Sequence, residues 1–130
     1  MKKVLLIMMI SVLALTACGK SEETTNTEAS QSSDVYEGVY FDYDYNEPEL
    51  KINANGDGTY NVYIGILRLA VFEDNTAELI EAGLEFRAED GAGNPIKGVI
   101  ALDGNDAVVT FTESTWSLIP NGTSYRYYRQ

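Results

Sequence analysis

Short turn sequences recur along the chain between residues 46 and 122, separated by runs in which apolar and polar residues alternate. Glycine, proline, asparagine and aspartate favour tight turns because they tolerate positive φ, fix φ, or hydrogen-bond to their own backbone. The segments between these closely spaced turns have the length of short strands. The sequence therefore predicts an antiparallel meander of about eight strands. The predicted turns are 46–48, 55–58, 73–75, 90–95, 103–106 and 120–122.

The residues between the turns alternate with a period of two, which is typical of strands that bury one face and expose the other. Residues 84–89 place Leu84 and Phe86 on one face and charged residues on the opposite face. In the first predicted strand, the same rule assigns Val39 and Phe41, with the tyrosines that follow at 43 and 45, to the buried face.

All aromatic residues lie between Tyr36 and Tyr128, so the folded unit is predicted to span residues 35–130. Because no long crossover connection is present, the strands are expected to close into a small barrel, with a sandwich as the alternative. Residues 75–83 allow a second interpretation: Asn75 followed by Glu78 resembles a capping box, and Gly83 could end one or two helical turns.

The N-terminal residues have the pattern of an export signal. Lys2 and Lys3 precede the run Val4–Leu15, which is apolar except for one serine and too short to span a bilayer. The run ends in Leu15-Thr16-Ala17-Cys18, which resembles the lipobox of bacterial lipoproteins. The resemblance implies cleavage before Cys18 and a lipid on its sulfur. Two or three acyl chains would then anchor the protein stably to a membrane.

Three segments follow from this pattern: a signal peptide at residues 1–17, a lipidated cysteine and tether at 18–34, and a β domain at 35–130. The tether lacks aromatic and large aliphatic residues, so it is expected to be disordered. The protein is therefore expected on the outer face of the cell membrane. Because Gly19 is not the aspartate that retains lipoproteins in the inner membrane, an outer-membrane location is the alternative in a diderm bacterium.

Acidic residues dominate the charge, with 20 Asp plus Glu against 9 Lys plus Arg. This excess repels phosphate backbones, so no nucleic-acid partner is expected, and basic partners are favoured.

The chain has no histidine, and its single cysteine is the one predicted to carry lipid. A Ser-His-Asp or Cys-His site therefore cannot be built, and no catalytic residue or cofactor is predicted. The closely spaced carboxylates Asp42 and Asp44, with Glu47 and Glu49, are the remaining candidates for glycoside hydrolysis, but a cleft across a saccharide is difficult to form on so small a barrel.

Residues 53–58 imitate the first half of an EF-hand calcium loop, and residues 42–46 imitate its opening ligands. Neither reaches the glutamate required at the twelfth position, where Ile64 and Asn53 stand instead. Residues 55–58 are better explained as a hairpin turn, and no metal site is predicted.

Tyrosine-rich segments near the C-terminus have two interpretations. Aromatic side chains can form an amphipathic platform for a ligand, or they can fill a core that has few leucines. Arginines among them could clamp an anion or pair with surface carboxylates. The candidate ligand-binding residues are Tyr63, Trp116, Tyr125, Arg126, Tyr127 and Tyr128.

Residues 93–129 resemble uncharacterised lipoproteins of Gram-positive bacteria, through Gly93-Asn94-Pro95, Ser114-Thr115-Trp116 and Asn121-Gly122-Thr123. The resemblance implies a small lipocalin-like barrel at the cell surface and brings no catalytic residues. Gly38-Val39-Tyr40 is also similar to the Gly-x-Trp start of lipocalins. This similarity implies that an arginine of the last strand, Arg126 or Arg129, covers the aromatic ring.

The leading functional hypothesis is a non-enzymatic, surface-tethered module that binds a protein, peptide, glycan or small ligand. One alternative is an inhibitor of a cationic enzyme such as lysozyme, suggested by the acidic surface. Another is a carrier of a small hydrophobic ligand, which requires an empty barrel interior.

Overall fold

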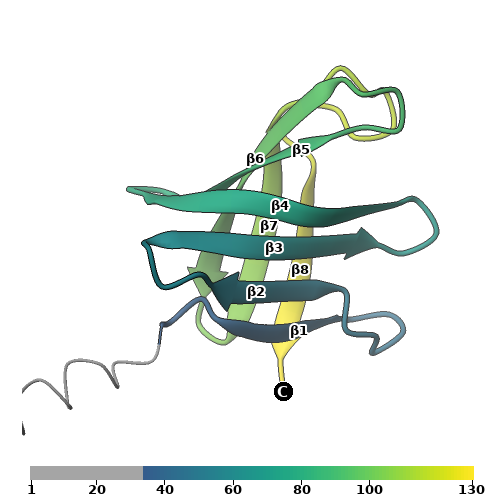
Figure 1. Ribbon diagram of the computed structural model, residues 1–130. Coiled ribbons are helices and arrows are strands. Elements are labelled where there is room, and N and C mark those ends of the chain that lie inside the picture. The colour runs from purple at the N-terminus through teal and green to yellow at the C-terminus, as the bar shows by residue number, and fades with distance from the viewer. Residues whose placement is uncertain (1–33) are drawn as a thin grey trace, which may run out of the picture. The chain divides into compact units, whose positions relative to one another are not determined.

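Eight strands follow one another along the chain, each antiparallel to the next, in the computed structural model, which describes residues 34–130 (Figure 1). The last strand pairs with the first, so the predicted closed barrel is confirmed. The predicted signal peptide, Cys18 and nearly all of the tether lie outside the described residues. The strands are β1 (Gly38–Asp42), β2 (Leu50–Ala54), β3 (Thr59–Ile66), β4 (Ala70–Ile80), β5 (Gly83–Glu89), β6 (Pro95–Asp103), β7 (Asp106–Glu113) and β8 (Ser124–Arg129).

The barrel interior is filled by apolar side chains from all eight strands. The Phe111 ring is fully buried there, with its centroid 5.6 Å from that of Phe86 and 5.9 Å from that of Phe72. Gly98 leaves room for this packing, because a Cβ there would lie 2.4 Å from a ring carbon of Phe86. The largest fully enclosed side chains are Tyr40, Phe86, Phe111, Leu50, Ile52, Ile64, Leu84, Ile96, Ile100, Ile119, Val62 and Val109.

The first strand buries the face opposite to the one predicted. Tyr40 is fully enclosed, whereas Val39 is 42% exposed. The prediction was wrong because both faces of β1 carry bulky residues, so alternation alone could not identify the inner one. The Tyr40 hydroxyl donates a 2.8 Å hydrogen bond to the backbone oxygen of Tyr36, and so links β1 to the segment before it.

Of the predicted turns, the one at residues 73–75 is wrong. These residues lie within β4, where Glu73 and Asp74 together oppose Tyr63 of β3. This is a β-bulge, and Asp74 takes a φ of 54° within it. The bulge resets the alternation, so that Phe72 and Asn75, three residues apart, both point inward. The chain turns instead at residues 67–69, between β3 and β4.

The helical alternative for residues 75–83 is also wrong, because β4 runs to Ile80 and a short turn leads into β5 at Gly83. Residues 34–130 contain no helix long and apolar enough to cross a membrane.

The barrel closes where β8 meets β1, a junction we call the closed seam. Tyr40 stands opposite Arg129, Phe41 opposite Tyr128, and Asp42 opposite Tyr127. The Arg129 guanidinium lies 4.7 Å from the Tyr40 ring centroid and donates hydrogen bonds of 3.0 Å to the backbone oxygens of Val35 and Glu37. The residues just before β1 are thereby fastened to the last strand.

The junction between β4 and β5, which we call the open seam, is incomplete. The eleven residues of β4 pair with β5 only from Ala77 to Ile80, opposite Phe86 to Gly83. Beyond Ala77 and Phe86 the two strands diverge, as the spreading of β5 away from β4 shows (Figure 1). Three residue pairs join the closed seam and four join the open seam, so the seams differ in what lies beyond the pairing: residues 70–76 of β4 have no partner in β5.

Candidate functional site

Aromatic side chains gather on the outer surface of the closed seam. Tyr128 lies between Phe41 and Tyr43, with ring centroids 6.0 Å and 4.9 Å away. Tyr43 is 58% exposed, so much of its ring faces solvent. We call Phe41, Tyr43 and Tyr128 the tyrosine surface.

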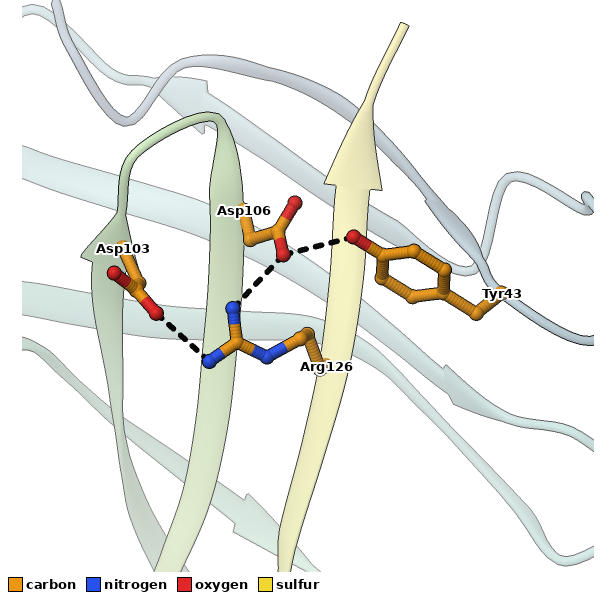
Figure 2. Close-up of polar contacts among 4 residues, drawn as sticks. All are labelled: Tyr43, Asp103, Asp106 and Arg126. Carbon is orange, nitrogen blue, oxygen red and sulfur yellow. Dashed lines mark hydrogen bonds and ion pairs between the residues drawn. The ribbon is translucent and has the colours of Figure 1, made fainter.

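A charged cluster beside this surface fixes the position of Tyr43 (Figure 2). Arg126 donates one hydrogen bond of 2.8 Å to Asp106 and another of 2.8 Å to Asp103. The Tyr43 hydroxyl donates to the same Asp106 oxygen, also at 2.8 Å. The hydrogen bonds from Arg126 and Tyr43 lower the pKa of Asp106, whereas accepting the Tyr43 proton makes Asp106 raise the pKa of that phenol. Asp106 therefore stays ionised and Tyr43 stays protonated at neutral pH.

The loop that carries Tyr43 is organised by Asp42 at the end of β1. Its carboxylate accepts backbone N–H bonds from Asp44, Tyr45 and Glu47, at 3.0, 2.6 and 2.9 Å. Burial raises the pKa of Asp42, but these donors outweigh it and hold the pKa below its ordinary value. The Asp42 carboxylate therefore stabilises the conformation of this loop.

A small cleft of about 200 Å³ opens at the barrel end next to this loop, between Tyr43, Ile66 and Tyr125. Tyr127 also lines this cleft, and its hydroxyl donates a 2.8 Å hydrogen bond to the backbone oxygen of Gly65 across the barrel. Burial raises the pKa of Tyr127 well above its usual range. Protonated tyrosines therefore line the cleft together with Asp42, Asp44 and Arg126.

The six candidate ligand-binding residues do not form one patch. Tyr125 and Tyr127 point inward, Tyr125 with its ring 6.1 Å from Phe111. Trp116, on the β7–β8 connection, packs partly against the core. Tyr63 lies on the outer face of β3, with the Lys51 ammonium 4.9 Å from its ring. Of the remaining two, Tyr128 belongs to the tyrosine surface, and Arg126 is linked to it through Asp106, which binds both Arg126 and Tyr43.

Sequence reasoning missed Tyr43, Asp103 and Asp106 as members of the site. Asp103 and Asp106 belong to a predicted turn, and they do flank the turn between β6 and β7. The charge pattern alone contained a signal: two aspartates three residues apart in a tight turn form a fork that an arginine of the neighbouring strand can bridge.

The two arginines of the last strand have different roles. Arg129 covers the ring of Tyr40, as the lipocalin resemblance implies for one of the pair, whereas Arg126 binds the two aspartates on the outer face. Gly38 is needed for the first arrangement, since it has a φ of +154° and a Cβ there would lie 3.3 Å from the Arg129 guanidinium.

The segment that imitates a calcium loop forms the predicted hairpin turn between β2 and β3. Its Asp57 carboxylate accepts hydrogen bonds from the Thr59 hydroxyl and backbone N–H, at 2.6 and 2.9 Å. Across residues 34–130, no three carboxylates are grouped closely enough to hold a metal ion.

Comparisons with protein-family models, curated proteins and solved structures found no match for this chain. What the tyrosine surface offers chemically is exposed aromatic ring area beside ionised carboxylates and amide groups, including Asn46, which accepts a hydrogen bond from the Tyr128 hydroxyl. Such a surface suits a ligand with an apolar face and hydrogen-bonding edges.

Proposed function

We propose that the protein is a lipid-anchored, non-enzymatic binding module of the bacterial cell envelope. The proposal rests on the sequence Leu15-Thr16-Ala17-Cys18 after a short apolar run, and on an exposed tyrosine, Tyr43, whose hydroxyl is hydrogen-bonded to Asp106. The chain has no histidine, and the Asp42 carboxylate is engaged by backbone donors, which argues against acid-base catalysis at the β1–β2 loop.

The single observation that carries the binding role is the geometry of Tyr43. Its ring is mostly exposed, yet its hydroxyl is hydrogen-bonded to Asp106 and its ring packs on Tyr128. Ordering a side chain in advance reduces the entropy lost when a ligand binds. An exposed aromatic ring held this way favours recognition over a merely structural role.

The ligand class that fits best is a saccharide of the envelope. A pyranose ring has an apolar C–H face that packs on an aromatic ring and hydroxyls that bond to carboxylates and amides. Tyr43 supplies the ring, and Asp103 and Asp106 supply carboxylate acceptors nearby. The Asn46 oxygen accepts from Tyr128 and Gln130, which leaves its NH2 group as a donor. The side chains that fill the barrel interior argue for an outer binding surface in preference to an internal carrier cavity.

Titration of the fragment Asp34–Gln130 with oligosaccharides of N-acetylglucosamine, followed by amide NMR, tests this proposal. All strands and core residues lie within this fragment, so it contains the complete barrel. We expect shifts around Tyr43 and Tyr128, and about fivefold weaker binding in Tyr43→Ala, from the loss of one aromatic contact. Tyr63→Ala is the matched control on another part of the barrel. Absence of binding, or equal losses in both variants, would refute this ligand class.

The anchor is tested separately by growing cells with a clickable fatty acid and isolating the full chain. We expect the label on the wild type and none on Cys18→Ser, which should appear in the soluble extracytoplasmic fraction. Label on the serine variant would contradict the proposal.

A further inference from the structure

The open seam contains a cleft with a volume of about 580 Å³. Its walls are the first part of β4, from Val71 to Thr76, and the last part of β5, from Arg87 to Glu89. These are the segments that diverge beyond the last paired residues, Ala77 and Phe86. The cleft is therefore a consequence of unfinished strand pairing.

Both walls present backbone edges without a partner strand. Residues 70–76 of β4 pair only with β3, and residues 87–89 of β5 pair only with β6. Alternate N–H and C=O groups of a strand point to each side, so the sides that face the cleft carry hydrogen-bonding groups the barrel does not use. An edge of this kind can accept an added strand.

Asn75 supplies an independent sign that the cleft receives a donor. This residue is only 8% exposed and is the one buried polar side chain within residues 34–130. Its Nδ2 donates to the backbone oxygen of Val62 at 3.1 Å, but its Oδ1 accepts nothing from residues 34–130. Since no fully enclosed side-chain polar atom in those residues lacks a partner, Oδ1 keeps some solvent-accessible area, and Asn75 is one of the residues that line the cleft.

The charges that line the cleft favour a positively charged donor. Glu73, Asp74 and Glu89 line the cleft with a single cation, Arg87. The Arg87 side chain is 71% exposed, and its guanidinium lies 3.6 Å from the carboxylate of Glu85, a residue that does not line the cleft. A negative field over an unpaired strand edge attracts positively charged chains and repels a second acidic copy of this one.

We propose that the open seam binds an extended peptide segment rich in lysine or arginine. The segment adds as a strand to the free edge of β4, donates a hydrogen bond to Oδ1 of Asn75, and places its basic side chains beside Glu73, Asp74 and Glu89. This site is on a different part of the barrel from the tyrosine surface, so the two proposals can be tested independently.

The test uses the isotopically labelled fragment Asp34–Gln130 and a short capped peptide of alternating lysine and valine. Amide shifts should concentrate at residues 71–76 and 87–89. A version of the peptide with alternate backbone nitrogens methylated keeps its charge but cannot pair, and we expect it to lose binding. Equal binding of the methylated peptide, or shifts spread over other strands, would overturn the proposal.

Paired variants separate local charge from net charge. Asp74→Asn with Glu89→Gln should weaken peptide binding about tenfold at low salt, since two ion pairs are lost and asparagine keeps the backbone conformation of residue 74. Glu78→Gln with Glu81→Gln makes the same change in net charge on the same hairpin and should leave binding unchanged. Equal effects of the two pairs would contradict a specific site.

Two further readouts complete the test. Tyr43→Ala should bind the peptide as the wild type does, so failure of the saccharide proposal and failure of this one are distinguishable. Sedimentation of the free fragment should show a monomer. A dimer dissociated by changes at the open seam would make a second copy the occupant and would refute the basic peptide.

Discussion

The closed seam joins strands that are far apart in the sequence, whereas the open seam lies between two consecutive strands. Tyr40 and Arg129, which meet at the closed seam, are 89 residues apart, whereas β4 and β5 are consecutive and joined by a short turn. Closing a short loop costs less entropy than closing a long one, so a hairpin should pair most easily. Yet the distant strands are joined by backbone pairing and side-chain contacts, while the hairpin stops half-way. Local side-chain and backbone features therefore decide where this barrel is open.

The bulge in β4 accounts for the difference. Bulges increase the twist of a strand and bend it, and this one lies just before the residues at which pairing with β5 begins. At the closed seam Arg129 has the opposite effect, because it holds the segment before β1 against β8.

The largest expected effect is the loss of Arg129. Arg129→Ala removes charged hydrogen bonds to two backbone oxygens and the contact with the Tyr40 ring, so we expect a loss of about 2–3 kcal/mol in the free energy of unfolding. Arg129→Lys should recover only part of this, because an ammonium lacks the planar fork. Denaturant unfolding of the fragment Asp34–Gln130 measures both.

Arg87→Ala, at the open seam, is the matched control. Because Arg87 is largely exposed and weakly paired, its removal should cost less than about 0.5 kcal/mol. Equal losses for the two arginines would erase the proposed contrast between the seams.

The bulge gives the next largest effect. Asp74→Val puts a β-branched side chain at a φ of 54°, which should cost about 1–2 kcal/mol. Glu73→Val, its exposed neighbour at ordinary φ, should be nearly neutral. Thermal unfolding compares the pair. If Glu73→Val proved the more damaging, the strain would lie elsewhere.

The smallest effect concerns pH and the loop after β1. Asp42→Asn removes acceptors for backbone N–H groups and should cost about 1 kcal/mol near pH 6. The lowered pKa of Asp42 means that its carboxylate stabilises the fold above the unfolded pKa near 4, and that this contribution disappears as pH falls through the folded pKa. The difference between wild type and variant should therefore shrink from pH 5 to pH 2. A constant difference over that range would show that ionisation of Asp42 does not matter.

Much of the fold was predictable because turn residues and alternation are local signals. The alternation of residues 84–89 fixed the inner face of β5 correctly. The same reasoning failed for β1, where Val39 and Phe41 look as apolar as Tyr40. It failed again at Asp74 and Asn75, since the residues that favour turns also favour bulges.

The sites were harder to predict than the strands. The resemblance pointed to an arginine over Tyr40, but only register selected Arg129 and left Arg126 for Asp103 and Asp106. The open seam had no sequence signature, because it depends on where two strands stop pairing.

Amide hydrogen exchange of the ligand-free fragment Asp34–Gln130, resolved residue by residue by NMR, tests the contrast between the seams most directly. The account predicts rapid exchange for the amides of residues 71–76 and 87–89 that face the cleft, with slow exchange at residues 40–42 and 127–129. Protection at the open seam equal to that at the closed seam would show that β4 and β5 pair along their full length in solution, and would contradict the account.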